Sequence, residues 1–486
     1  MRKILLGTTA VVGLALVAQA ANAQQARPAA RPAPAPVAAP VAPPPLPATS
    51  VAPAGTAAAR FQTPVGITGA GSHGSDGVPN RPETPTTSGT VVRLGGYFDF
   101  SYGNVQDDAD KAFVRNTAGG ITNAKGRQRS DFRNEAELNV YADGIAANGM
   151  RYGALFEFQM DNMGGNNGGS TNGSGTGVDF DELYGFVKGG WGELRFGQED
   201  SAASLLQIRR PGVLWMGDSD AWDEFLLSSG YVIAGVGDGN DATKIIYLSP
   251  QFMGFDAGIS YAANRFEGER ADAPNSLTTS QRDATGLSNE ISAALRYRGT
   301  FGPVGLGASF VAQFADAARQ QATGAPIAIQ DQSITTYSAG LLLRAYGFQL
   351  GGDYTWGNYR TTPANGTIGK GLDGSDQWAV GLAYTIGAFT VGGMYSQGTQ
   401  DNGTDTMGAK LSDRTQTYMG LGVAYVLAPG MTLFANWNQV EDENIPDGTP
   451  SSKGAGAAGT KGLISFGTGD KTRDITVLVA GVRVAF

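Results

Sequence analysis

The sequence predicts an all-β protein, a transmembrane antiparallel β-barrel of about 16 strands. Three observations predict this fold. From Val91 onward, apolar and polar residues alternate in pieces of about ten residues, the pattern of strands with one apolar face. The connections between these pieces are alternately short and long. Beyond the first 23 residues, no apolar run is long enough to cross a bilayer as a helix.

Composition excludes several classes of protein. The chain has 486 residues, no cysteine, one histidine and a formal net charge of −9. Without cysteine it cannot form a disulfide scaffold, a zinc ribbon or a Cys-ligated iron–sulfur cluster, and one histidine cannot build a multi-His metal site. An acidic chain is also a poor binder of phosphate backbones. We therefore assign no metal-binding residues and expect no cofactor and no nucleic-acid partner, while calcium binding by loop carboxylates stays open.

Residues 1–23 have the composition of a secretory signal peptide. Arg2 and Lys3 precede an apolar run that extends to Ala18, and the segment ends in the small-x-small sequence of residues 21–23. This is the pattern that signal peptidase accepts. A transmembrane anchor is the alternative, but the apolar run is shorter than the roughly 20 residues that a spanning helix needs.

Residues 24–90 form a segment of biased composition. They hold 14 of the 23 prolines of the chain, crowded with alanine, and then become rich in glycine and serine. Such a composition cannot bury a core, so we expect a disordered periplasmic segment, extended in its Pro/Ala part. Two interpretations stay open: a disordered tail without a function, and a periplasmic spacer that contacts peptidoglycan or another partner. His73, the single histidine, lies here and is expected to be solvated.

The first strand shows the alternation in its simplest form. Its apolar face carries Leu94, Gly96, Phe98, Phe100 and Tyr102. Its other face carries Arg93, Gly95, Tyr97, Asp99 and Ser101. The next two pieces repeat the pattern and place several charges on the polar face, namely Arg133, Glu135, Glu137, Arg151 and Glu157. Aromatic residues gather near strand ends, as expected at a membrane–water interface.

The spacing of the connections sets the number of strands. Short turns such as 346–347 and 428–430 alternate with long loops such as 200–242 and 440–472. Short turns on one rim and long loops on the other are typical of outer-membrane barrels. The strands are expected to start near residues 91, 131, 150, 180, 191, 243, 255, 289, 304, 333, 348, 376, 389, 414, 431 and 474.

A sheet with a lipid-facing side must close on itself. An open edge would leave backbone N–H and C=O groups unpaired in hydrocarbon, at a cost of several kcal/mol each. The inward faces are too charged for a dry core, and about sixteen strands enclose a bore wide enough for water. The sequence therefore predicts an aqueous channel. Inward-facing aromatics are expected at Tyr97, Tyr141, Tyr418 and Phe434.

Residues 91–486 resemble Gram-negative porins of the trimeric general-diffusion type. The resemblance depends on residues 184–187 (YGFV) with 189–198 (GGWGELRFGQ), on 247–255 (YLSPQFMGF) and on 428–433 (APGMTL). It also depends on the alternation of the last strand, which ends in Phe486. The resemblance implies an outer-membrane location amid lipid and lipopolysaccharide, a homotrimer, and Phe486 as a signal for the outer-membrane insertion machinery.

The resemblance further implies that the third loop, residues 200–242, folds into the barrel and narrows it. Acidic residues of this loop would face a basic wall and create a transverse field across the constriction. The candidate acids are Asp218, Asp220, Asp223 and Glu224. The candidate basic residues are Arg93, Arg133, Arg151 and Arg195. In the alternative, the acids are solvated and the arginines pair with neighbouring glutamates.

The expected function is passive diffusion of small hydrophilic solutes and ions through a water-filled pore. An enzyme is disfavoured because the barrel has no histidine to activate a nucleophile, and we assign no catalytic residue. A plugged transporter needs about 22 strands and a folded plug. A substrate-specific porin, or an anchor that tethers the membrane to the cell wall through residues 24–90, stays open.

The charge balance suggests a mild preference for cations. Residues 1–90 hold six basic and two acidic side chains, which leaves 29 basic and 42 acidic ones in residues 91–486. Much of this excess lies in loops, and a field from the rim is screened within about 8–10 Å at physiological salt. The expected preference is therefore weak.

Overall fold

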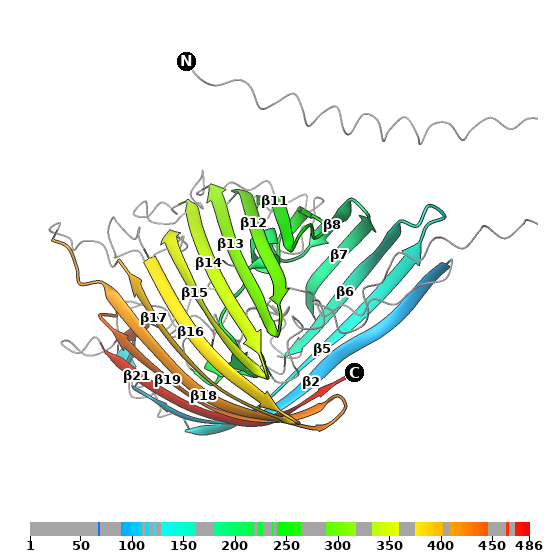
Figure 1. Cartoon of the computed structure of the whole chain (residues 1–486). Helices are drawn as coiled ribbons and strands as arrows, with labels where there is room; N and C mark the ends of the chain where they lie inside the picture. The colour runs from blue at the N-terminus through cyan, green and yellow to red at the C-terminus, as the bar shows by residue number, and fades with distance from the viewer. Residues whose placement is uncertain are drawn as a thin grey trace, which may run out of the picture. The chain divides into compact units, whose positions relative to one another are not determined.

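Sixteen antiparallel strands close into a barrel in the computed structural model of the protein (Figure 1). The structure describes residues 67–68, 89–108, 113–115, 121–122, 128–161, 179–217, 222–226, 236, 241–264, 288–316, 333–358, 375–401, 409–445, 463–465 and 472–486. The expected signal peptide and most of residues 24–90 lie outside these ranges. All described residues belong to one unit, residues 54–486.

The strands follow the chain around the barrel. Their bounds are β2 (Gly89–Asp107), β5 (Ser130–Ile145), β6 (Arg151–Asp161), β7 (Asp179–Gly189), β8 (Gly192–Gln198), β10 (Thr243–Leu248), β11 (Phe255–Asn264), β12 (Ser288–Phe301), β13 (Val304–Asp316), β14 (Ile334–Ala345), β15 (Phe348–Asn358), β16 (Ser375–Ile386), β17 (Phe389–Gln400), β18 (Arg414–Ala428), β19 (Met431–Glu443) and β21 (Arg473–Ala485). Each start lies within two residues of its expected position. The all-β barrel and its strand number are therefore confirmed.

The barrel closes where its first and last strands pair. β2 and β21 form an antiparallel ladder that runs from Tyr97 opposite Ala485 to Asp107 opposite Ile475. The C-terminal residue extends this ladder. The N–H of Phe486 donates to the carbonyl of Gly96 at 3.0 Å, and the N–H of Gly96 donates back at 3.1 Å. The seam thus uses the chain up to its last residue.

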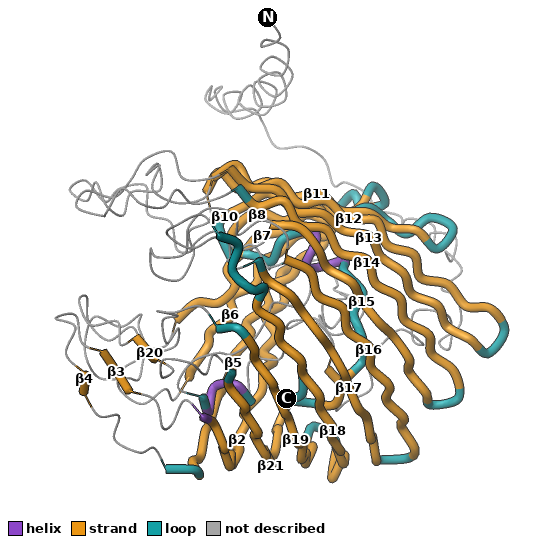
Figure 2. The backbone as a smooth tube through the Cα atoms, turned by 90° about the vertical axis from the view of Figure 1, so that its left-hand side faces the viewer, coloured by secondary structure: helices purple, strands orange, loops and turns teal. Residues whose placement is uncertain are grey.

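Tight turns join the strands at one end of the barrel (Figure 2). Between β14 and β15 the whole connection is Tyr346 and Gly347, with φ angles of 52° and 84°. Two consecutive positive φ angles define the type I′ hairpin turn, whose twist matches that of the flanking strands. Long connections leave the opposite end. This alternation agrees with the pattern expected from the sequence.

The two faces of the wall differ in chemistry. Outward residues are large, apolar and exposed, for example Leu350, Leu382 and Leu421, which are 52%, 48% and 57% exposed. Their strand neighbours of opposite parity point inward and are polar, as at Asp353 and Thr355. Because the exposed face is apolar along whole strands, it matches a hydrocarbon environment. Among the described residues, no helix is long and apolar enough to span a bilayer.

Aromatic pairs mark both ends of the outward face. Near the short turns the rings of Phe348 and Tyr384 lie 4.2 Å apart. Toward the long loops, Tyr337 stacks on Trp356 at 5.7 Å and Trp378 packs against Tyr395 at 5.4 Å. Two belts of amphipathic rings are expected where a wall crosses both membrane–water interfaces. The outward face therefore shows where the membrane begins and ends.

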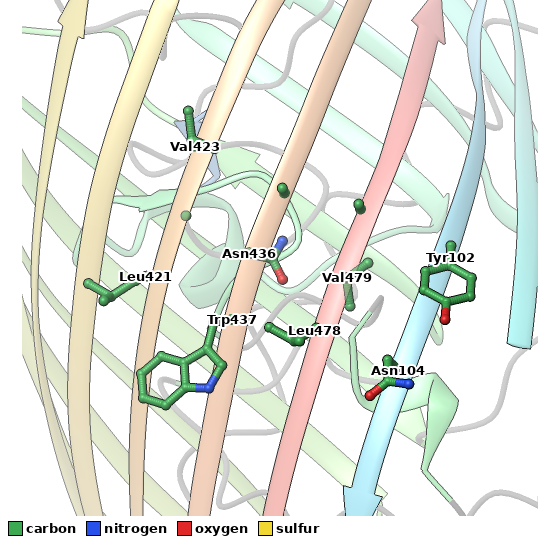
Figure 3. Close-up of a pocket in the computed structure, with 11 residues that line it drawn as sticks. Tyr102, Asn104, Leu421, Val423, Asn436, Trp437, Leu478 and Val479 are labelled. Atoms are coloured by element: carbon green, nitrogen blue, oxygen red, sulfur yellow. The ribbon is translucent and has the colours of Figure 1, made fainter. Parts of the chain in front are cut away.

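A shallow depression interrupts the outward face over β18, β19, β21 and β2 (Figure 3). Its volume is about 670 Å³, and small residues such as Ala435 and Ala480 lie beside larger ones such as Leu421 and Trp437. Leu421 and Leu478 here are 57% and 48% exposed. The depression therefore faces the membrane and not the bore. Trp437 lies near the middle of β19, unlike the strand-end position expected for aromatic residues.

Five short strands of the described residues are not part of the barrel wall and form two small separate sheets. β3 (Phe113–Arg115) pairs with β4 (Ile121–Thr122) and with β20 (Leu463–Ser465), so the connections after β2 and before β21 meet. β1 (Ile67–Thr68) pairs with β9 (Gly212–Val213) of the third long connection. β1 falls within the segment expected to be a disordered periplasmic arm. That segment also ends slightly earlier than expected, because β2 already begins at Gly89.

Candidate functional site: the bore and its inner loop

Residues 199–217 and 222–226, which belong to the connection between β8 and β10, lie inside the barrel. We call these residues the inner loop. It contains α3 (Ala202–Leu206), β9 and a 3₁₀ turn, η2 (Asp223–Phe225). Its partners are inward-facing residues of the wall, and they are met in the order of the strands. The expectation that the third long loop folds into the barrel therefore agrees with the structure.

Serine hydroxyls of the wall hold the start of the inner loop. Three backbone N–H groups donate to serines on successive strands, at 3.1, 3.1 and 2.7 Å, namely Ala202 to Ser260 on β11, Ala203 to Ser292 on β12 and Ile208 to Ser309 on β13. The first N–H groups of a short helix lack partners within the helix. The serines satisfy groups that would otherwise need water. α3 thereby lies against the wall.

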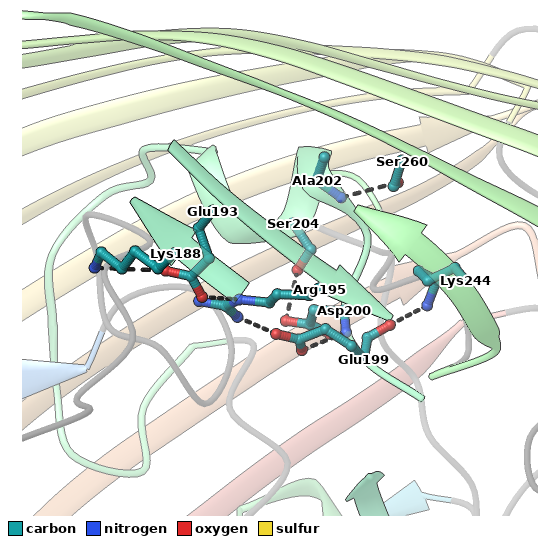
Figure 4. A network of polar contacts seen from close by, with 9 residues as sticks. All are labelled: Lys188, Glu193, Arg195, Glu199, Asp200, Ala202, Ser204, Lys244 and Ser260. Atoms are coloured by element: carbon teal, nitrogen blue, oxygen red, sulfur yellow. Dashed lines mark hydrogen bonds and ion pairs between the residues drawn. The ribbon is translucent and has the colours of Figure 1, made fainter. Parts of the chain in front are cut away.

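A charged cluster fixes the root of the inner loop (Figure 4). Arg195 on β8 is buried and pairs with Glu193 at 2.8 Å and with Glu199, the first residue of the loop. Lys188 lies 3.5 Å from the other oxygen of Glu193. Lys244 on β10 donates to the backbone carbonyl of Glu199. Two strands thus hold the point where the chain leaves the wall.

The middle of the inner loop is held by a buried ion pair. The Nη1 of Arg210 lies 3.2 and 3.1 Å from the two carboxylate oxygens of Asp353 on β15. The backbone N–H of Arg210 donates to the same carboxylate at 2.9 Å. Both side chains are almost fully buried, at 0% and 1% exposure. Asp353 therefore binds the side chain and the backbone of one loop residue.

The far part of the inner loop reaches β18, β19 and β2. Asn436 donates to the carbonyl of Leu214 at 3.0 Å, and the Tyr418 hydroxyl accepts from the N–H of Gly217 at 2.7 Å. The indole of Trp215 stacks on Phe434 at 5.1 Å and donates to Asp99 at 3.1 Å. The loop thus spans the inner wall from β10 to β2. The inward positions expected for Tyr418 and Phe434 agree with these contacts.

The four predicted basic residues lie at two levels along the barrel axis, two beside the inner loop and two near the short turns. Arg133 lies over the Trp215 ring at 5.3 Å, and Arg195 lies at the root of the loop, so both are beside the inner loop. Arg93 precedes Asp99 by six residues on β2, which is about 20 Å toward the short turns. Arg151 is the first residue of β6, directly after a short turn. The structure does not bring Arg93 and Arg151 to the loop.

Most of these arginines form ion pairs with carboxylates of the neighbouring wall. Arg93 pairs with Asp143, and Arg133 lies 2.8 Å from Glu135. This is the alternative in which wall arginines pair with neighbouring carboxylates. The same motif recurs elsewhere on the inner wall, where the pairs are Arg296 with Asp256, Arg414 with Asp442, Arg473 with Asp107 and Arg483 with Asp99. The bore is lined by paired charges that keep it polar.

Only part of the predicted acidic group can be placed. Asp218 and Asp220 lie outside the described residues, as does the side chain of Glu224. Asp223 begins the 3₁₀ turn η2 and is 9% exposed. The next described anchor, Phe225, packs against Gly103 of β2, where an added Cβ would lie 2.6 Å from its ring. The opposition of these acids to the arginines stays a prediction.

Several residues that hold the inner loop were not expected from the sequence. They are Ser260, Ser292, Ser309, Asp353, Asn436 and Glu199. Each one is an ordinary polar residue of inward parity or lies next to a strand end. Only the cross-strand register shows which of them lie opposite the loop. The alternation of the strands likewise indicates no partner for Arg210. In the described ranges, no cluster of three or more acidic or histidine side chains is arranged to hold a metal ion.

Comparison with known proteins agrees with this architecture. The family model for Gram-negative porins matches residues 8–445. The chain is 22% identical over 446 residues to the uncharacterized protein RC0098 of Rickettsia conorii, covering 80% of this chain and 95% of that protein. An anion-selective porin from Comamonas acidovorans is similar at 17% identity, with a TM-score of 0.48 over 82% of this chain and 100% of that one.

Two further solved structures are similar over a comparable share of the chain. The outer membrane channel DcaP of Acinetobacter baumannii matches at 12% identity and a TM-score of 0.47, covering 82% of this chain and 98% of that one. OmpT of Vibrio cholerae, in its trimer form, matches at 13% identity and a TM-score of 0.44, covering 80% and 99%. The family model covers most of the sequence, and the closed barrel with polar inner and apolar outer faces accords with it. The chain belongs to the Gram-negative porin family.

Proposed function

We propose that this outer-membrane porin forms a water-filled channel for passive diffusion of small hydrophilic solutes and ions. The observation that carries the proposal is the position of the inner loop. It is bonded along the inner wall from β11 to β19 by residues such as Ser260, Asp353 and Asn436. A loop held along the wall narrows a bore without crossing it. Porins are channels and not enzymes, so no reaction is assigned.

The narrowest part of the path is proposed to lie beside Trp215. There Arg133 of β5 faces the loop, and Asp99 of β2 holds the indole. Glu135 of the same strand pairs with Arg133 at 2.8 Å and supplies a negative charge there. Paired charges of both signs in a narrow aqueous path favour polar solutes over apolar ones of equal size. Asp218, Asp220, Asp223 and Glu224 are proposed to contribute acidic groups to this constriction.

The proposed partners follow from the membrane location. The apolar outward face would contact lipid, with lipopolysaccharide around the long loops, and three copies would associate as a homotrimer. The solved trimer form of OmpT belongs to a different protein and supports this only as a precedent. The Pro/Ala part of the N-terminal segment, which precedes β1, is proposed to extend on the periplasmic side and to contact peptidoglycan.

Single-channel recording in a planar bilayer tests the channel directly. Purified full-length protein is expected to give large ohmic conductance steps, grouped in threes if the trimer is the functional unit. Protein shown to be folded and inserted, but with silent or very small channels, would contradict open diffusion. Conductance that falls saturably on addition of one solute class would instead favour a substrate-specific porin.

A further inference from the structure

A row of glycines lies under the inner loop. Inward-facing positions on five adjacent strands, β14 to β18, lack a side chain where the loop passes. These positions are Gly340, Gly351, Gly381, Gly392 and Gly422. We call these five residues the glycine seat. Glycine weakens a strand, and within a strand it often marks the close approach of another backbone.

The cross-strand register shows that these glycines are neighbours. Gly351 lies directly opposite Gly381, and Gly392 lies directly opposite Gly422. Gly340 lies directly opposite Ser309 of β13. Ser309 is the residue whose hydroxyl accepts from the N–H of Ile208. Between β14 and β15, and between β16 and β17, the glycines are offset by two residues, so the seat is an oblique row that crosses the strands. It begins where the serine contacts of the loop end.

The inner loop follows this row in order. Ile208 lies over Gly340, Pro211 lies over Gly351 and Gly381, and Val213 lies over Gly392 and Gly422. Extended residues advance about 3.3 Å each, and neighbouring strands are about 4.8 Å apart. The five residue steps from Ile208 to Val213 therefore cover a length similar to the four strand spacings from β14 to β18. The loop crosses the strands as a nearly extended segment that matches the row beneath it.

A methyl group on the seat would collide with the loop. A Cβ at Gly340 would overlap the carbonyl oxygen of Ile208, and one at Gly381 would overlap the carbonyl oxygen of Pro211. At Gly422 it would lie 2.9 Å from the Cβ of Val213. Ordinary carbon contacts are about 3.5–4.0 Å, and the first two obstacles are backbone atoms that no rotamer change can move aside. The loop would have to move away from the wall, into the bore.

We propose that the glycine seat determines the free cross-section of the channel. By removing side chains beneath residues 208–213, it lets the inner loop lie backbone against backbone on the wall. The rest of the bore stays open to solutes. The seat is thus a determinant of solute size, separate from the charged residues around Trp215. This inference rests on the proposed channel function.

The primary test adds single methyl groups to the seat. Gly340→Ala and Gly381→Ala are expected to lower single-channel conductance by about half or more, because the loop would occupy part of the aqueous path. Permeation of larger neutral sugars into vesicles should fall more steeply than permeation of small ones. The matched control is Gly393→Ala on β17, an outward glycine whose added Cβ would meet the flexible tip of Leu421 at 3.0 Å. It should conduct as the unmodified protein does.

A compensating pair separates the seat from a general loss of folding. Gly422→Ala would bring its Cβ to 2.9 Å from the Cβ of Val213 and to 3.2 Å from one of its methyls. Adding Val213→Gly removes both atoms and is expected to restore most of the lost conductance. General destabilisation of the strand would not be rescued in this way. Failure of rescue, or seat variants that fold and conduct like the control, would overturn the proposal.

The outcomes for the two proposals are distinguishable. If the unmodified protein does not conduct at all, the channel function itself fails. If it conducts and the seat variants do not differ from Gly393→Ala, only the seat fails. An engineered disulfide checks the loop position, since the sequence has no cysteine of its own.

The pair for that disulfide is Ala202→Cys with Gly258→Cys. The Cβ of Ala202 lies 3.3 Å from an ideal Cβ at position 258, close to the usual disulfide spacing of about 3.5–4.5 Å. We expect this pair to oxidise readily with the conductance unchanged. A pair that stays reduced, or that blocks current once oxidised, would contradict a loop seated on the wall.

Discussion

Individual residues of the bore act mostly through buried partners. Asp353 is the clearest example, since one carboxylate binds the guanidinium and the backbone of Arg210. Removing one member of a buried pair leaves the other charge without compensation, and this typically costs about 3–5 kcal/mol. An exposed pair contributes about 0–1 kcal/mol. Burial therefore decides which of the many ion pairs matter for stability.

Asp353→Asn is expected to destabilise the inner loop strongly. Arg210 would lose its buried counter-charge, and we expect a loss of about 3 kcal/mol in the free energy of unfolding together with noisier open-channel current. Urea titration of folded protein in vesicles measures the first effect. Asp413→Asn is the matched control, because its pair with Lys410 is exposed at 47% and 63%. Equal losses in the two variants would contradict an anchoring role for Asp353.

Arg133 is the residue expected to influence ion selectivity most. It pairs with Glu135, which also accepts a 2.8 Å hydrogen bond from Tyr97. Arg133→Ala would leave this carboxylate without its cation beside the loop, so the channel should become more cation-selective. The zero-current potential in asymmetric KCl measures the change. Arg151→Ala, at the short-turn end, should shift it less, because charges beyond about 8–10 Å are screened. A shift toward chloride in Arg133→Ala would contradict the proposed constriction.

At the scale of elements, hairpins and the closing seam build the barrel. Each short turn connects strands that are neighbours in the chain, so their pairing is local. The seam between β2 and β21 joins the two ends of the barrel sequence. Its two strands are far apart along the chain, so its pairing has a higher loop-closure cost than that of any hairpin. Phe486 lies at this seam, and its side chain is 69% exposed.

Two changes at Phe486 should separate closure from assembly. Phe486→Ala keeps both backbone hydrogen bonds to Gly96, so folding into vesicles is expected to stay unchanged. Deleting the residue removes both bonds and should slow closure in the same assay. In cells, both variants should accumulate less folded porin if the side chain is the assembly signal. Normal cellular levels of folded Phe486→Ala would contradict that role.

At the scale of the whole molecule, part of the N-terminal segment meets the inner loop. β1 pairs with β9, with Ile67 opposite Val213 and Thr68 opposite Gly212. β9 lies on the inner wall over Gly392 and Gly422. At least this part of the segment therefore reaches the inner loop, in addition to any spacer function of its Pro/Ala part.

Deletion of residues 24–88 tests this relation. The barrel would keep β2 from Gly89 onward, and removing the partner of β9 is expected to raise the conductance. Planar bilayer recording measures the change, and circular dichroism checks that the strand content is retained. Unchanged conductance would mean that the segment does not restrict the bore. Sedimentation of both proteins with peptidoglycan then tests the tether.

The strands were predictable from the sequence because their signal is local. A wall between lipid and water must alternate apolar and polar side chains with period two, and tight turns need glycine or another residue at positive φ. Sixteen strand starts, the apolar outward face and the inward parity of Tyr418 and Phe434 follow from this alone. The third loop was identified by its length and by the family resemblance.

Only the tertiary structure decided what the inner loop touches. The partners of Arg210, Trp215 and Ile208 are Asp353, Asp99 and Ser309, which lie far from them in sequence. Their meeting depends on the register of many successive ladders, which period-two alternation does not specify. For the same reason, the glycine seat could not be predicted from the sequence. Each of its glycines is unremarkable in its own strand, and closure of the barrel aligns them beneath one extended segment.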